Sequence, residues 1–204
     1  MELLEAIRQR RTVRKFLSEP VAANDIKELV RRALHAPSVA NALPWKFIVV
    51  TRPELISDLA VAVHRRVQAL FGDASKENVL KTVDHFSTIF EGAPAVIFIA
   101  MKPYHAIADD LDAGVGHEAL NEMRRFPDIQ SVGAAVQNLL LSAVDLGLGA
   151  CWLSGLMTAR RELEAMLDVQ PPWELVTAVA VGKPESKPSP RPSPSIDDFI
   201  ELME

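Results

Sequence analysis

Hydrophobic positions along the chain follow two different periods, which divide the chain into predicted helices and strands. Between Ile26 and Leu34, apolar side chains fall at the first, fourth, fifth, eighth and ninth positions, which places them on one face of a helix. The segment Lys46–Thr51 (KFIVVT) is instead rich in β-branched and aromatic residues and indicates a strand. A second strand is indicated at Ala95–Met101, and because this run is apolar throughout we expect it to be buried on both faces.

The most apolar of the expected helices lies late in the chain. Ser131–Leu146 (SVGAAVQNLLLSAVDL) is apolar almost all round, which predicts a central buried helix that ends before Gly147. Near the amino end, Asn24 is the expected N-cap of a helix that Pro37 stops. Residues 102–128 have no clear pattern. The remaining helices are expected at 2–9, 24–35, 54–70, 76–90 and 158–167, and the remaining strands at 150–153 and 175–181.

The tail beyond Gly182 differs in composition from the rest of the chain. Five prolines lie between Pro184 and Pro194, which is too dense for a packed helix or strand and favours an extended arm. The arm ends in an apolar patch at 196–203, which must be covered either by the same chain or by a second subunit. We therefore expect one body at residues 1–182 and a Pro-rich arm at 183–204.

Composition narrows the class of protein. The 204 residues suggest a single domain, with 49% apolar and 24% charged residues as in ordinary globular proteins. A net charge of −5 argues against general nucleic-acid binding. The single cysteine, Cys151, rules out a disulfide framework and fits a reducing cytoplasm. Neither a signal peptide nor an apolar run of membrane-spanning length is present, so we expect a soluble cytoplasmic protein.

The first candidate for chemistry is the basic segment at residues 8–15 (RQRRTVRK), which has five cations and no carboxylate. If this stretch is extended, alternation aims Arg10, Thr12 and Arg14 to the same side, and three converging donors suit a phosphate group. On spacing alone, a solvated basic turn at a helix end explains these residues better. The second candidate, Ala36–Trp45 (APSVANALPW), is by itself simply a turn, because Pro, Ser and Asn favour turns.

Taken together and in order, these segments resemble the nitroreductase family of flavoproteins. The match is one of order and spacing over nearly the whole chain, except for residues 55–90 and 102–128. No single motif is decisive. The stretches that carry the resemblance are RRTVRKF (10–16), APSVANALPWKFIVV (36–50), GAP (92–94), GAAVQNLLL (133–141), GLGACW (147–152) and VGKP (181–184).

The resemblance implies an α+β fold with a central mixed β-sheet flanked by helices. It further implies a domain-swapped homodimer in which the extended C-terminal arm docks on the partner subunit, with two FMN sites in the interface. The implied function is that of an FMN-dependent oxidoreductase, which passes hydride from NADH or NADPH to a small electrophilic acceptor by a ping-pong mechanism. Nitroaromatics, quinones and flavins are the acceptors it implies. Because the flavin carries the hydride, no catalytic side chain is expected.

The site residues follow from the resemblance, position by position. Four residues of the basic segment would bind FMN: Arg10, Arg11, Thr12 and Arg14. Of these, Arg10 and Thr12 would hold the phosphate and Arg14 would lie near the flavin N1/O2 edge. A loop containing Pro37, Ser38 and Asn41 would reach the flavin of the other subunit. Backbone N–H groups near Ser154 and Gly155 would face N5 and O4, and Arg191, with Lys187 as the reserve, would complete the phosphate site.

Two departures and several alternatives stay open. Thr12 stands where serine is more usual, and Leu43 stands where glutamine often precedes the Pro-Trp pair, which affects the substrate more than the cofactor. A specialised member, such as a dehalogenase, a flavin-cleaving enzyme or an azoline dehydrogenase, is a second interpretation. A third is a non-catalytic flavin-binding or sensing protein, and a fourth a nucleic-acid binder that uses the basic segment. The acidic and histidine residues between His105 and Glu118 match no standard metal site, so no metal is expected.

Overall fold

The computed structural model describes residues 1–72, 76–111, 114–189, 192 and 194–203. A sheet of four strands lies at its centre, in the order β1-β2-β4-β3. Each strand pairs antiparallel with its neighbours, and the β2–β4 ladder has one irregularity, between Ile99 and Ala100. The strands are β1 (Trp45–Val50), β2 (Ala95–Met101), β3 (Gly149–Leu153) and β4 (Glu174–Gly182).

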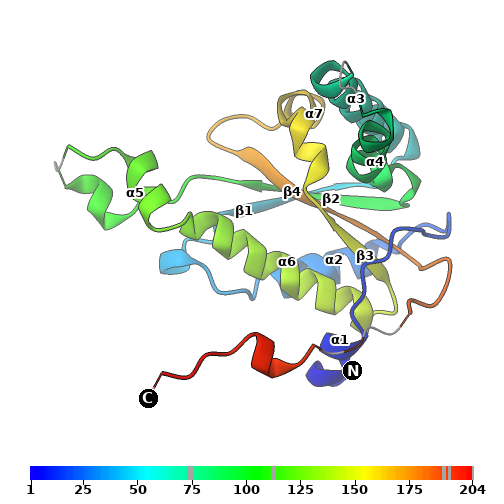
Figure 1. Ribbon diagram of the computed structural model, residues 1–204, viewed down its shortest axis with the longest axis horizontal. Helices are drawn as coiled ribbons and strands as arrows, with labels where there is room; N and C mark the ends of the chain where they lie inside the picture. Colours follow the sequence, from blue (N-terminus) through cyan, green and yellow to red (C-terminus); the bar gives the residue numbers. More distant parts are fainter. Residues whose placement is uncertain (73–75, 112–113, 190–191, 193, 204) are drawn as a thin grey trace.

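Helices cover both faces of this sheet (Figure 1). One face carries α2 and α6, and the other carries α3, α4 and α7, while α5 lies beyond one end of the sheet. The fold is therefore α+β, as expected. The α-helices are α1 (Leu3–Gln9), α2 (Ala23–Ala33), α3 (Pro53–Phe71), α4 (Glu77–Thr88), α5 (His117–Met123), α6 (Pro127–Asp145) and α7 (Arg160–Met166). Short 3₁₀ helices are η1 (Val39–Asn41), η2 (Ile89–Gly92), η3 (Ile107–Asp110), η4 (Gly155–Ala159) and η5 (Ile196–Asp198).

The expectation of a mixed sheet is wrong for the four strands that the structure describes. Strands β2 and β3 run in the same direction, but β4 lies between them and is antiparallel to both, and β1 is antiparallel to β2, so these four strands form no parallel ladder. Parallel pairing is found instead between the basic segment and β3, at the isolated bridge of Thr12 with Ala150.

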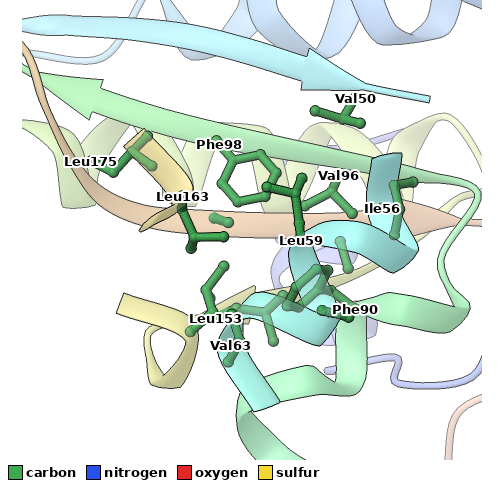
Figure 2. Packing of buried hydrophobic residues seen from close by; sticks show 14 of the residues in the cluster. Val50, Ile56, Leu59, Val63, Phe90, Val96, Phe98, Leu153, Leu163 and Leu175 are labelled. Carbon is green, nitrogen blue, oxygen red and sulfur yellow. The ribbon is translucent and has the colours of Figure 1, made fainter. Parts of the chain in front are cut away.

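The core confirms what the apolar pattern of β2 predicted. All seven residues of β2 are buried, and the sheet separates two hydrophobic clusters. On the α3 side, Leu59 and Val63 pack with Phe90 and Phe98, whose rings meet edge to face at 6.3 Å (Figure 2). These clusters pack against both faces of the sheet, so segments that lie along β3 are positioned by a buried framework.

The start of α6 differs most from the sequence-based expectation, and the N-cap of α2 also differs. Helix α6 begins at Pro127 rather than Ser131, because proline fits the first turn, where its missing N–H is not needed, and Phe126 breaks the preceding chain with a φ of 54°. Helix α2 begins at Ala23 with Ala22 as its N-cap, so the expected cap, Asn24, lies inside the first turn. Among the described residues, no helix is long and apolar enough to cross a membrane.

Candidate functional site

The basic segment lies as an extended stretch along the edge strand β3. The Val13 N–H donates to the carbonyl oxygen of Ala150 at 3.0 Å, and Val13 is buried. Beneath it, a Cβ on Gly149 would lie 2.7 Å from the Val13 Cβ, which is closer than side chains can approach. The glycine at the start of β3 therefore lets the basic segment lie directly on the sheet.

Alternation along the segment separates its side chains into two sets. Arg11 and Val13 line a cavity of about 370 Å³, whereas Arg10, Thr12 and Arg14 do not. Extended backbone sends successive side chains to opposite sides, which agrees with this division. The convergence of Arg10, Thr12 and Arg14 on a phosphate stays a prediction. The cavity is lined by Arg8, Gln9, Arg11, Val13, Val144, Leu148, Gly149, Pro184, Lys187, Pro188 and Ser189.

The guanidinium of Arg11 donates hydrogen bonds to backbone carbonyl groups. Its Nη1 group donates to the carbonyl oxygens of Arg8 and Arg10, both at 2.7 Å, and its Nε donates to that of Ser189 at 3.1 Å. Arg11 therefore joins the end of α1, the basic segment and the C-terminal arm. A role of Arg11 in FMN binding stays a prediction, and these contacts supply a structural reason for an arginine at this position.

The side chains on the other side, those of Arg10, Thr12 and Arg14, make fewer contacts with the rest of the chain. Within the described ranges, their side chains make no hydrogen bond or ion pair, and Thr12 and Arg14 are exposed. The guanidinium of Arg14 lies over the Phe86 ring, 5.7 Å from its centroid. Burial raises the pKa of the Cys151 thiol, and the positive charge of Arg14 opposes this rise, so Arg14 also lies within electrostatic reach of β3.

Ser154 and Gly155 lie where β3 passes into η4, with Ser154 as the N-cap of η4. A Cβ on Gly155 would lie 2.9 Å from the Ser87 Oγ and 3.3 Å from the Ser87 Cα, so α4 packs tightly here. Phe86, the preceding residue of α4, carries the Arg14 contact. The structure therefore brings Arg14 and Gly155 to the same turn of α4, which the sequence did not indicate.

The loop with Pro37, Ser38 and Asn41 is held by α6. The Val39 N–H donates to the Ser131 Oγ at 3.0 Å, and the Ser38 Oγ accepts from the Leu43 N–H at 3.1 Å. Asn41 has a φ of 54°, in the left-handed region that asparagine tolerates better than most residues. None of the hydrogen bonds of this loop within the described part of the chain reaches the basic segment. Its expected role, at the flavin of a second subunit, stays a prediction.

The C-terminal arm begins beside the basic segment. The Leu17 N–H donates to the Lys183 carbonyl oxygen at 2.9 Å, and the Glu185 N–H donates to that of Lys15 at 3.1 Å. Lys187 then lines the same cavity as Arg11. The preferred phosphate ligand of the arm, Arg191, lies outside the described residues, so its position is not assigned.

Phe86 and Ser87 are the site residues that sequence reasoning did not find. They belong to the helix expected at 76–90, inside the stretch without recognisable motifs. Their helical pattern indicates only that Val83 and Ser87 share a face, one turn apart. Contact with Arg14 and Gly155 depends on residues far away in the sequence, so no local signal could have indicated it.

Comparison with known proteins gives consistent matches along the chain. The model of the nitroreductase family matches residues 7–183. The putative NAD(P)H nitroreductase YfhC of Bacillus subtilis is 26% identical over 98% of this chain and 94% of its own length. The 5,6-dimethylbenzimidazole synthase of Rhodospirillum rubrum is 30% identical over 92% of this chain and 85% of its own length.

Solved structures agree with these matches. A BluB-like flavoprotein from Clostridium difficile superposes with a TM-score of 0.89 at 28% identity, over the full length of both chains. A putative nitroreductase from Desulfovibrio desulfuricans, in complex with FMN, superposes with a TM-score of 0.70 at 27% identity, over 100% of this chain and 98% of the other.

Proposed function

Because this chain belongs to the nitroreductase family, we propose that it is an FMN-dependent oxidoreductase, which takes hydride from NADH or NADPH and passes it to a small electrophilic acceptor. The observation that carries the proposal is the set of donors on the outer side of the basic segment. These residues, Arg10, Thr12 and Arg14, belong to the segment that lies along the edge strand β3, and no protein carboxylate within the described residues pairs with either arginine.

The donor chemistry of this side fits FMN. A phosphate needs several converging donors, and Arg10 and Thr12 supply a guanidinium and a hydroxyl one residue apart on the same side. Arg14 would place a cation at the N1/O2 edge. The backbone of Gly155 packs against the same turn of α4 that carries the Arg14 contact, and its N–H would face N5 or O4. Bound FMN would supply the hydride-transfer chemistry. The protein holds the group and orients it.

A second subunit is part of the proposal. Leu3, Leu4 and Ile7 of α1 are 67%, 57% and 50% exposed, and Phe199 and Leu202 of the arm are each 77% exposed. Apolar surface of this kind calls for a partner. We propose a homodimer in which the arm at 183–204 docks on the partner body. Removal of residues 183–204 should weaken both the dimer, measured by light scattering, and the retention of flavin. A flavin-loaded monomer of the full chain would contradict the dimer.

The visible spectrum of the purified protein tests the cofactor. The protein should be yellow or take up FMN with one equivalent per chain. FAD should bind less well because its phosphate is joined to a bulky adenosine nucleotide and does not end the molecule. NADH or NADPH should then bleach the bound flavin under anaerobic conditions. Flavin that binds but is not bleached would favour a non-catalytic flavin-binding protein, and a colourless protein that does not bind FMN would contradict the proposal.

The cytoplasmic location inferred from composition also stays a proposal.

A flavin-cleaving reaction is the second candidate function. It is favoured by the similarity to a 5,6-dimethylbenzimidazole synthase and to a BluB-like flavoprotein, both matched over most of their length. The dimethylbenzene ring of that product is also a ring of FMN, so the reaction would consume the flavin. Aerobic incubation of the protein with reduced FMN distinguishes the two candidates. Mass spectrometry should detect dimethylbenzimidazole only if the flavin is cleaved, whereas FMN is recovered intact from an oxidoreductase.

A further inference from the structure

The last turn of α4 contacts two parts of the candidate site that are far apart in the sequence. Phe86 places its ring under the Arg14 guanidinium, with 5.7 Å between the charge centre and the ring centroid. The next residue, Ser87, is buried against Gly155. One turn of helix thereby connects the cation of the basic segment to the backbone at the end of β3.

The surroundings of Phe86 suggest a reason for an aromatic residue at this position. Val83 and Ser87 of the same helix turn toward the core, whereas Phe86 is 50% exposed and contributes little to core packing. The ring of the neighbouring His85 meets the Phe86 ring edge to face, with 5.3 Å between the centroids. Among the described residues, Arg14 is the cation that lies over this half-exposed ring.

We propose that Phe86 is a positioning residue for Arg14. This inference rests on the proposed function, in which Arg14 lies beside the flavin N1/O2 edge. An arginine side chain has several rotatable bonds, and fixing it at a charge costs conformational entropy. The ring face attracts the guanidinium and pre-orders it, so less freedom is lost when the reduced, anionic flavin forms. Phe86 acts through Arg14 and favours reduction of the flavin without touching the reacting atoms.

The midpoint potential of FMN-loaded protein measures this effect. Phe86→Leu should lower the equilibrium constant for two-electron reduction about threefold, which corresponds to about 14 mV. In the Arg14→Ala background the same substitution should leave the potential unchanged, because the positioned cation is already gone. Phe86→Tyr keeps the ring face and should restore the wild-type potential. Phe71→Leu, at an exposed phenylalanine at the end of α3, is the matched control and should have no effect.

A second measurement needs no flavin. In FMN-free protein the side-chain protons of Arg14 should show upfield ring-current shifts by NMR, which Phe86→Leu removes and Phe86→Tyr keeps. If Phe86→Leu does not fold, Phe86→Trp provides the opposite test, because a larger ring face should raise the potential.

The outcomes separate this inference from the function on which it rests. Absence of the ring-current shift overturns the inference, whatever the FMN affinity and the midpoint potential are. A ring-current shift combined with an unchanged potential, or an equal loss of potential with and without Arg14, also overturns it and leaves the proposed function standing. Failure of the wild-type protein to bind FMN ends both, even if the NMR data show that the contact is present.

Discussion

Along residues 10–14 successive side chains face opposite sides, and the two sides differ in what satisfies their polar groups. On the cavity side, Val13 packs over Gly149 and Arg11 donates to three backbone carbonyls. On the outer side, Arg10 and Arg14 have no carboxylate partner among the described residues. One side of this short segment therefore makes contacts that stabilise the fold, whereas the polar groups of the other side have no protein partner among the described residues. Mutation of Arg10 and mutation of its neighbour Arg11 should therefore have different effects on FMN affinity and on the free energy of unfolding.

The largest expected effect is the loss of FMN affinity on mutation of Arg10. Arg10→Ala would remove the proposed charge-assisted phosphate contact of about 1.5–3 kcal/mol, so the FMN dissociation constant should rise by roughly 10- to 150-fold. The unfolding free energy of FMN-free protein should change by less than about 0.5 kcal/mol, as for other surface substitutions. Fluorescence titration and denaturant unfolding measure the two quantities. A large loss of stability in the FMN-free protein would show that both sides of the segment serve the fold.

Substitution of Gly149 tests whether the cavity side of the segment must pack closely against β3. Gly149→Ala forces a methyl group against Val13 and should reduce the unfolding free energy of FMN-free protein by about 1–3 kcal/mol. FMN affinity should fall as well, because the segment moves away from β3. Gly92→Ala is the matched control, since a Cβ there meets no atom within 4 Å. Equal effects of the two substitutions would mean that the segment does not need its close approach to the sheet.

The Arg14→Ala substitution tests whether the two arginines of the outer side, Arg10 and Arg14, have different roles. A cation beside N1/O2 favours reduced flavin over oxidised flavin, whereas a phosphate contact supports both equally. Arg14→Ala should therefore lower the midpoint potential by about 30 mV, or about 1.4 kcal/mol for two electrons. Binding of oxidised FMN should fall less than in Arg10→Ala. If Arg10→Ala shifts the potential and Arg14→Ala does not, the roles of the two residues are reversed.

The smallest effect is expected for Arg11. Arg11→Ala should cost about 1 kcal/mol of unfolding free energy, since its hydrogen bonds to carbonyls are partly solvated. Loss of the contact with Ser189 should also speed proteolysis of the arm at residues 183–189. Arg8→Ala is the control, because Arg8 lines the same cavity without a side-chain hydrogen bond among the described residues. A rise in the FMN dissociation constant as large as that of Arg10→Ala would make Arg11 a phosphate ligand.

Local pattern was sufficient for most of the elements. Ala95–Met101 was predicted as a doubly buried strand because seven consecutive apolar residues allow few other structures, and β2 has these same bounds. The start of α6 was missed because Pro127 opens a helix without showing an apolar period. The antiparallel sheet was not predictable either, because strand order depends on which strands meet after the helices have packed.

For the site, the sequence by itself determined the residue types and their alternation. Extended backbone places Arg10, Thr12 and Arg14 on one side whatever surrounds them. The tertiary structure alone decided which side meets the cavity, since Arg11 and Val13 are directed there by Gly149 of β3 and by the arm. It alone brought Phe86 to Arg14 and Ser87 to Gly155. Periodicity is a property of neighbouring residues, whereas these contacts join segments that only the packed core holds together.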